Sequence, residues 1–513
     1  MENYSKGAFV PETFSICVCN KNIGSELSED FTLPDYQPEL RKLLKLTPIL
    51  TPPAHYIGAG QIELSGNISY DVLYCGEDGQ LYSARIPSTY SFETTMDDVA
   101  DADMSEGMRV MASVDPESVT GRVMAPRKIG IRTRLGAHIC AYAPARVTET
   151  ITGLDDVSSL RRLLGRAEYA DIIACAEESV PMGDEVIVEQ REGEIRMIGA
   201  DGRVFVSEAS AANDCIMCRG ELILGIMICR EGSEEIECIT RKLPFAREMS
   251  APGVSVGDEC RAWGECQTVN VSVGEGRLIC EASMSLSAEA QKKQAFTYTR
   301  DIYSTAAPVE VVYADKVLTR PLRASNGNFT QSGVFDAAEN QIPAGARIIN
   351  ADGYASVDSM TAERGRCVMT GEVRYNILYA DGEEYGCREL SQPWRYEADI
   401  GSDVSDGELD GSAELTVISC RARMDGERVS VDSEISAAWR ACRPVRVKMP
   451  ADARFSPMTE ARRGDCIVCY PESSDTLWSV ARRYRADADR VCANNSLTGD
   501  PMMSLAGVKY LII

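Results

Sequence analysis

Histidine is almost absent from this sequence, and so are several features that define large classes of protein. The only histidines are His55 and His138, among 513 residues. No apolar run approaches the roughly 20 residues that a membrane-spanning helix needs, and residues 1–6 lack the basic and apolar regions of a secretory signal. We therefore expect an intracellular protein that is not integral to a membrane.

Positive charge is also scarce. The chain holds 53 Lys and Arg against 78 Asp and Glu, a formal net charge of −25. This excess of negative charge repels a phosphate backbone, so we expect no nucleic-acid partner. The balance changes from Arg463 to the C-terminus, where six basic residues meet six acidic ones. The change marks the C-terminal segment as a separate unit.

No complete catalytic set can be assembled from the residues that are present. Residues 253–257, Gly-Val-Ser-Val-Gly, match the nucleophile elbow of α/β-hydrolases, but that fold places its histidine after the serine and both histidines precede it. The sequence also has no Gly-x-x-x-x-Gly-Lys-Ser/Thr loop for a nucleotide. We therefore predict a protein that is not an enzyme and that holds no cofactor.

Cysteine is abundant but shows no framework spacing. The nineteen cysteines are scattered along the chain, which favours reduced and mostly buried thiols over disulfides. Cys215 with Cys218 and Cys466 with Cys469 have the spacing of zinc ligands. Apolar residues fill both gaps, and no nearby third ligand completes either pair, so we predict no metal.

A segment that occurs three times is the strongest positive signal in the sequence. The copies begin at Gly66, Gly220 and Gly371 and read GNISYDVLY, GELILGIMI and GEVRYNILY. Apolar residues at every second position place one face of an extended strand on a core, so each copy predicts a strand. Further matching segments follow downstream, at offsets of 149 and 151 residues.

Short alternating strands separated by turn residues are typical of β-sandwiches and barrels. We predict a mainly β fold with three tandem β-sandwich-like repeats, over residues 1–150, 151–310 and 311–455. The first repeat includes an N-terminal arm, in which leucines at helical spacing predict a short helix over residues 38–46. Residues 158–173 are a second helix candidate, as a connector.

The segment 463–513 has a different pattern. Residues 466–470 predict a strand, residues 474–484 a capped helix, residues 487–494 a second helix and residues 508–512 a closing strand. Asp475 or Ser474 is expected to cap the first helix, because short polar side chains accept hydrogen bonds from its free backbone amides. The order is βααβ, in about fifty residues.

This segment resembles a LysM module, on DTLWSVARRY (residues 475–484), NNSL (residues 494–497) and Ala506-Gly507 before a short apolar strand. The resemblance implies a groove between Asp475, Thr476 and Leu477 on one side and Asn495, Ser496 and Leu497 on the other, with Lys509 nearby. Ser474 stands where the family has glycine. The serine side chain would crowd a glycan groove. The alternative is that Asp475 only caps a helix while Leu477 and Trp478 fill a small core.

Residues 30–45 (DFTLPDYQPELRKLLK), with the strand beginning at Gly66, resemble the SPOCS domain, also called DUF3794. Three such domains followed by a LysM module is the layout of SipL-type spore coat morphogenetic proteins of clostridia. The resemblance implies a non-enzymatic scaffold in the mother-cell cytoplasm, at the forespore surface and spore coat. It further implies that the LysM module binds the coat basement-layer ATPase, stage IV sporulation protein A.

Two other readings stay open. One is an envelope protein that binds peptidoglycan or another glycan through its LysM module. The other is a hydrolase of cell wall or cortex, which requires a catalytic set that the sequence does not provide.

Overall fold

A computed structural model describes residues 13–58, 60–97, 107–146, 159–188, 193–230, 235–274, 276–382, 384–455, 466–497 and 499–513. The mainly β fold is confirmed: strands make up most of these residues, and two short helices lie near the C-terminus. No helix among the described residues is long and apolar enough to cross a membrane.

The first group of strands forms two sheets around one core. One sheet has the order β1-β7-β6, and in the other β4 lies at the centre and pairs with β2, β3 and β5. A cluster that includes Ile68, Val72, Leu135 and Ile139 joins the two sheets. The strands are β1 (Thr13–Thr32), β2 (Leu40–Leu50), β3 (Ala54–Gly58), β4 (Gln61–Gly76), β5 (Leu81–Thr95), β6 (Arg109–Ala125) and β7 (Lys128–Arg146).

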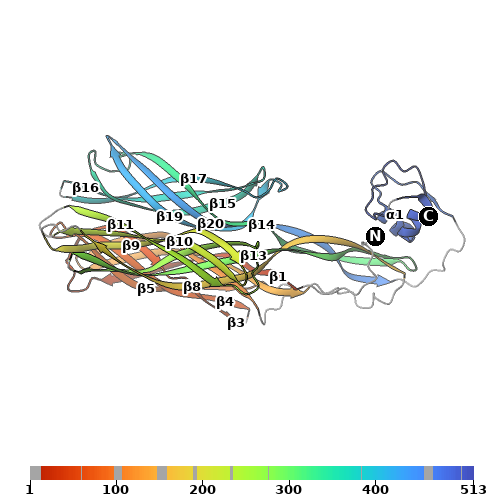
Figure 1. Cartoon of the computed structure of the whole chain (residues 1–513), viewed down its shortest axis with the longest axis horizontal. Helices are drawn as coiled ribbons and strands as arrows, with labels where there is room; N and C mark the ends of the chain where they lie inside the picture. The colour runs from red at the N-terminus through yellow and green to blue at the C-terminus, as the bar shows by residue number, and fades with distance from the viewer. Residues whose placement is uncertain are drawn as a thin grey trace.

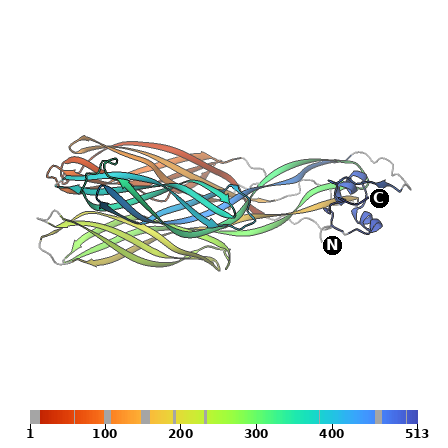
Figure 2. The same ribbon diagram turned by 90° about the horizontal axis from the view of Figure 1, so that it is seen from above.

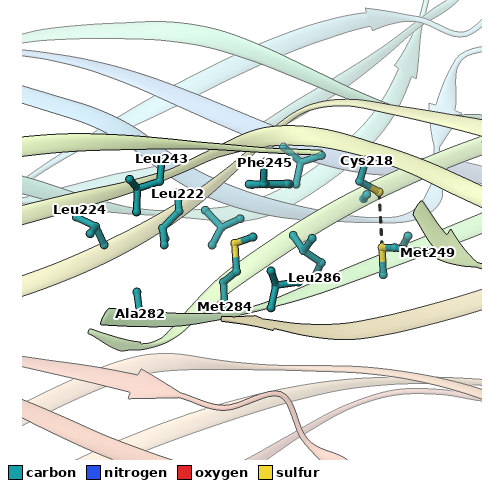
Figure 3. Close-up of a cluster of buried hydrophobic side chains, with 14 of the residues drawn as sticks. Cys218, Leu222, Leu224, Leu243, Phe245, Met249, Ala282, Met284 and Leu286 are labelled. Atoms are coloured by element: carbon teal, nitrogen blue, oxygen red, sulfur yellow. Dashed lines mark hydrogen bonds between the residues drawn. The ribbon is translucent and has the colours of Figure 1, made fainter. Parts of the chain in front are cut away.

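The second group has sheets of order β12-β13-β8 and β11-β10-β9. Figure 3 shows part of the core between them, where Leu222 and Leu224 of β10 meet Met284 and Leu286 of β13. The strands are β8 (Leu160–Ile187), β9 (Ile195–Ala212), β10 (Cys215–Arg230), β11 (Ile236–Ser250), β12 (Glu259–Gly274) and β13 (Arg277–Ser304).

The third group has sheets of order β14-β20-β19 and β17-β16-β15-β18. Its core cluster includes Tyr375, Ile377, Ile435 and Trp439. The strands are β14 (Val309–Asp336), β15 (Arg347–Glu363), β16 (Arg366–Asp381), β17 (Glu384–Asp399), β18 (Gly407–Glu408), β19 (Asp410–Asp425) and β20 (Arg428–Phe455).

The repeated segments lie in the central strands β4, β10 and β16. Each of these strands has 16 residues, and the repeated glycine is the sixth. Opposite each glycine stands an aromatic residue of the next strand: Tyr90, Phe245 and Trp394. A Cβ atom on any of the three glycines would come within 2.8 Å of that aromatic ring. The glycines therefore let a large ring lie flat over the sheet.

Two helix predictions are wrong. Residues 38–46 lie mostly in strand β2, which pairs antiparallel with β4, and residues 160–173 begin the long strand β8, which pairs with β13. In β2, register shifts occur at Leu40/Lys42 and Leu43/Lys45. Each such bulge adds a residue to one strand, so apolar side chains three residues apart face the same side and imitate helical spacing.

The three groups lie side by side with their strands along the long axis of the molecule (Figures 1 and 2). Two two-stranded ribbons extend beyond the sheets, formed by residues 160–172 with 291–304 and residues 309–321 with 442–455. Tyr169 of one ribbon packs on Leu318, Val447 and Met449 of the other. We call this pair of ribbons the stalk.

The C-terminal unit, residues 466–513, lies at the far end of the stalk (Figure 1). It consists of strand β21 (Val468–Cys469), helix α1 (Leu477–Tyr484), helix α2 (Ala488–Asn495) and strand β22 (Leu511–Ile512). The two strands pair antiparallel, with Val468 opposite Ile512 and Cys469 opposite Leu511.

Candidate functional site

The C-terminal unit has a small core of its own. Cys469, Val480, Leu505 and Leu511 form one buried cluster. Leu477, Val491 and Cys492 form a second one, which Leu497 also contacts. These side chains come from both helices, both strands and the loop after α2, so the unit is a compact module.

On the first side of the predicted groove, Asp475 and Thr476 have structural roles. The side chain of Thr476, not of Asp475 or Ser474, caps α1, and it forms a reciprocal capping box with Ser479. Asp475 is 5% exposed and accepts hydrogen bonds from the backbone N–H of Glu472 at 3.0 Å and from Arg483 Nη2 at 2.6 Å. These two donors hold the pKa of Asp475 below its usual value.

The other side of the predicted groove is similar. Asn495 Nδ2 donates to the carbonyl oxygens of Val491 at 2.8 Å and Ile512 at 2.7 Å, and its Oδ1 accepts from the backbone N–H of Ile512 at 2.8 Å. Asn495 thus fixes strand β22. Ser496 is the left-handed C-cap of α2, with φ of 54°.

The two sides meet in the core, where Leu477 and Leu497 belong to one cluster. Lys509 is exposed. Five of the seven predicted residues therefore make contacts within the unit, and Ser496 and Lys509 are exposed to solvent.

Sequence reasoning missed an exposed apolar face on the unit. Cys469 and Leu511 point into the core, so the alternation of a strand places Val468 and Ile512 on the opposite face, and Tyr470 and Tyr510 directly flank the two strands. These four side chains are 49, 37, 75 and 55% exposed, respectively. The signal available in the sequence was the presence of apolar residues on both faces of so short a sheet. We call these four residues the outer face.

Trp478 is placed differently from the sequence expectation. It is 4% exposed, but it packs on Leu163 and Tyr303 of the stalk, together with Ala481 and Ala488, rather than inside the unit. The helices therefore turn one face to the stalk and the outer face is free.

A second candidate region lies between the three groups of strands. A cavity of about 1740 Å³ is lined by residues of all three, among them Asp71, Asp115, Glu265, Tyr354 and Glu414. Asp115 accepts a hydrogen bond from the hydroxyl of Tyr354 at 3.5 Å. A cavity of this size holds many water molecules, since one requires only about 15 Å³.

The carboxyl groups in this cavity come from different groups of strands. Burial, followed by the neighbouring charges of Asp115 and Glu414, raises the pKa of Glu265 to about 8. Burial, followed by the charge of Asp115, raises the pKa of Glu414 to about 7. The side chains border the water-accessible cavity, yet protein surrounds them on most sides. Among the described residues no cluster has the ligands to hold a metal ion.

Comparison of the chain with protein-family models, with curated proteins and with solved structures found no match in any of the three.

Proposed function

We propose that this chain is a non-enzymatic scaffold of spore coat assembly that acts in the mother-cell cytoplasm at the forespore surface. In this proposal, three SPOCS-like β-sandwich domains carry a LysM-like unit, and that unit binds the coat basement-layer ATPase, stage IV sporulation protein A. The proposal rests on the sequence resemblances given above.

The observation that carries the proposal is the outer face of the C-terminal unit. Four large side chains are exposed there: Val468 and Ile512 on the two short strands, and Tyr470 and Tyr510 next to them. Tyrosine is enriched in protein interfaces because it offers a large rigid surface with a polar tip. The face lies at the far end of an elongated molecule, where a large partner can approach it (Figure 1).

The alternative, binding of peptidoglycan in the LysM groove, has less support. The carboxylate of Asp475 and the side-chain amide of Asn495 would have to recognise sugar hydroxyls, but both already make hydrogen bonds within the unit. A ligand that competed for them would disturb the capping loop or strand β22.

The test is capture of the purified ATPase by the full chain and by a Tyr470→Ser/Tyr510→Ser variant. We expect the variant to bind at least roughly tenfold more weakly, about 1.4 kcal/mol, because both exposed rings are lost. Tyr36→Ser is the matched control, because Tyr36 is 83% exposed and belongs to the first group of strands. Asp475→Arg is a poor probe, since it would remove the buried carboxylate that pairs with Arg483.

Equal capture by the wild type and the double variant would show that the outer face does not bind the ATPase. If the wild type sedimented with peptidoglycan and captured no ATPase, the glycan alternative would replace it.

A further inference from the structure

The contact between the C-terminal unit and the stalk has the composition of an interface between two molecules. At its centre the rings of Trp478 and Tyr303 meet edge to face, with centroids 4.8 Å apart and planes at 71°. Leu163, Ala481 and Ala488 complete the apolar centre. Aromatic anchors surrounded by polar contacts are the usual anatomy of protein interfaces.

Polar bonds surround this centre. Asp301 Oδ2 accepts from Trp478 Nε1 at 2.8 Å and from Arg482 Nη1 at 2.8 Å. The hydroxyl of Tyr303 donates to the carbonyl oxygen of Ala486 at 2.8 Å, and Arg161 forms an ion pair with Asp487. We call Arg161, Leu163, Asp301 and Tyr303 the stalk receptor.

Two features show that the unit and its receptor are separable. The core clusters of the unit contain no residue of the stalk, so the unit does not depend on the receptor for its own packing. The receptor belongs to β8 and β13, whereas the chain enters the unit after β20. The unit therefore docks on a strand pair to which it is not directly connected.

We propose that the stalk receptor accepts the C-terminal unit of a second copy of this chain as well as its own. An exchanged unit makes the same contacts as the resident one, so exchange needs no new interface. Covalent attachment gives the resident unit a high effective concentration, of millimolar order for short linkers, and only this favours the resident unit over that of another copy. Exchange in one direction from copy to copy is a head-to-tail contact, which closes into a ring or continues as an open chain, and reciprocal exchange between two copies gives a closed dimer. This inference does not depend on the identity of the ATPase partner.

Two full-length variants with complementary defects test the proposal. Trp478→Ala removes the docking side chain and leaves the receptor intact. Asp301→Ala/Tyr303→Ala destroys the receptor and leaves the unit intact. Neither variant alone has both an intact unit and an intact receptor, so each should remain a monomer. In an equimolar mixture the free unit of the second variant should occupy the free receptor of the first and form a 1:1 heterodimer, measured by light scattering.

The matched control replaces the second variant by Tyr303→Phe, which keeps the ring contact and loses only the hydroxyl bond to Ala486. Its unit stays docked on its own receptor, so its mixture with Trp478→Ala should contain at least roughly tenfold less heterodimer at the same concentration. A mixture of the two defective variants that stays monomeric at about 100 µM, a tenth of the millimolar effective concentration, overturns the proposal.

Protection of the Val480 and Leu511 amides from hydrogen exchange shows whether the unit is folded in each variant. If Trp478→Ala loses this protection, Arg482→Glu takes its place, because it sets a negative charge against Asp301 without altering the core. Its mixture with the receptor variant must then form the heterodimer, or the proposal fails.

Discussion

Glu289 is the residue whose environment most clearly links two groups of strands. It lies on β13 and forms ion pairs with Arg261 of β12 at 2.9 Å and with Arg440 of β20 at 2.7 Å, and the three side chains are 1, 3 and 5% exposed, respectively. Burial alone would raise the pKa of Glu289, but Arg440 and Arg261 outweigh it and hold the pKa below its usual value. Arg261 also donates to the carbonyl oxygen of Ser412, on β19.

Substitution Glu289→Gln should therefore destabilise the protein strongly. It leaves two buried guanidinium groups without a counter-charge, which costs about 3–5 kcal/mol. Denaturant unfolding measures the loss. Glu397→Gln is the control, because Glu397 also pairs with two arginines, Arg366 and Arg395, but is 37% exposed. We expect less than about 1 kcal/mol there, and equal losses for both variants would contradict this account of the buried pair.

At the scale of elements, the repeated glycines of β4, β10 and β16 determine how each central strand packs. A Cβ atom at Gly371 would lie 1.9 Å from the carbonyl oxygen of Ser356 and 2.8 Å from the ring of Trp394. Backbone atoms cannot move aside as a flexible side chain can, so the sheet itself would have to shift.

Gly371→Ala is accordingly expected to lower the free energy of unfolding by about 1–3 kcal/mol, the usual cost of an overpacked core. Gly183→Ala tests the same change in strand β8, where the nearest atom to a Cβ is the carbonyl oxygen of Cys280 at 3.6 Å. That contact is ordinary, so this control should keep or gain stability, by up to about 1 kcal/mol. Thermal unfolding of the two variants and of the wild type measures both changes in stability. A Gly371→Ala chain as stable as the wild type would refute the packing argument.

The elements also show what sequence patterns convey. Strict alternation in β4, β10 and β16 predicted strands correctly, because each pairs with the strand that follows it without a register shift and has one face on a core. Strand β2 was mistaken for a helix, because its bulges change the spacing of the leucines and only pairing with β4 reveals them. The polar residues of the predicted groove lie at the ends of the two helices, and their engagement within the unit depends on distant partners such as Ile512. The stalk contact of Trp478 joins residues about 175 positions apart, and no local pattern signals it.

At the scale of the whole molecule, we expect the carboxyl groups of the central cavity to make the stability of the protein dependent on pH. Glu265 and Glu414 have raised pKa values, so the folded state binds more protons than the unfolded state between about pH 4.5 and pH 8. Stability therefore falls as the pH rises through this range. The charged and titratable groups that face the pair are Asp115 of β6, Glu177 of β8, Arg261 of β12, Glu289 of β13 and Tyr354 of β15. Arg374 of β16 in turn acts on Tyr354.

Melting temperatures of the wild type and of a Glu265→Gln/Glu414→Gln variant, taken from about pH 6 to pH 9, test this linkage. Near the lowest pH, where both carboxyls are protonated, the variant and the wild type should have similar melting temperatures. As the pH rises, the melting temperature of the variant should become the higher of the two. A constant difference between the two chains at every pH would show that these carboxyls do not titrate in this range.

We propose that the elongated β body presents its C-terminal unit to a coat-forming partner. The most direct measurement is the affinity of the purified stage IV ATPase for the full chain and for a chain that ends at Phe455. The three groups of strands have their own cores, separate from those of the C-terminal unit, so the shorter chain should stay folded. The account predicts that the full chain binds and that the shorter, folded chain loses binding. Equal affinity for both chains would place the interface on the β body and contradict the account.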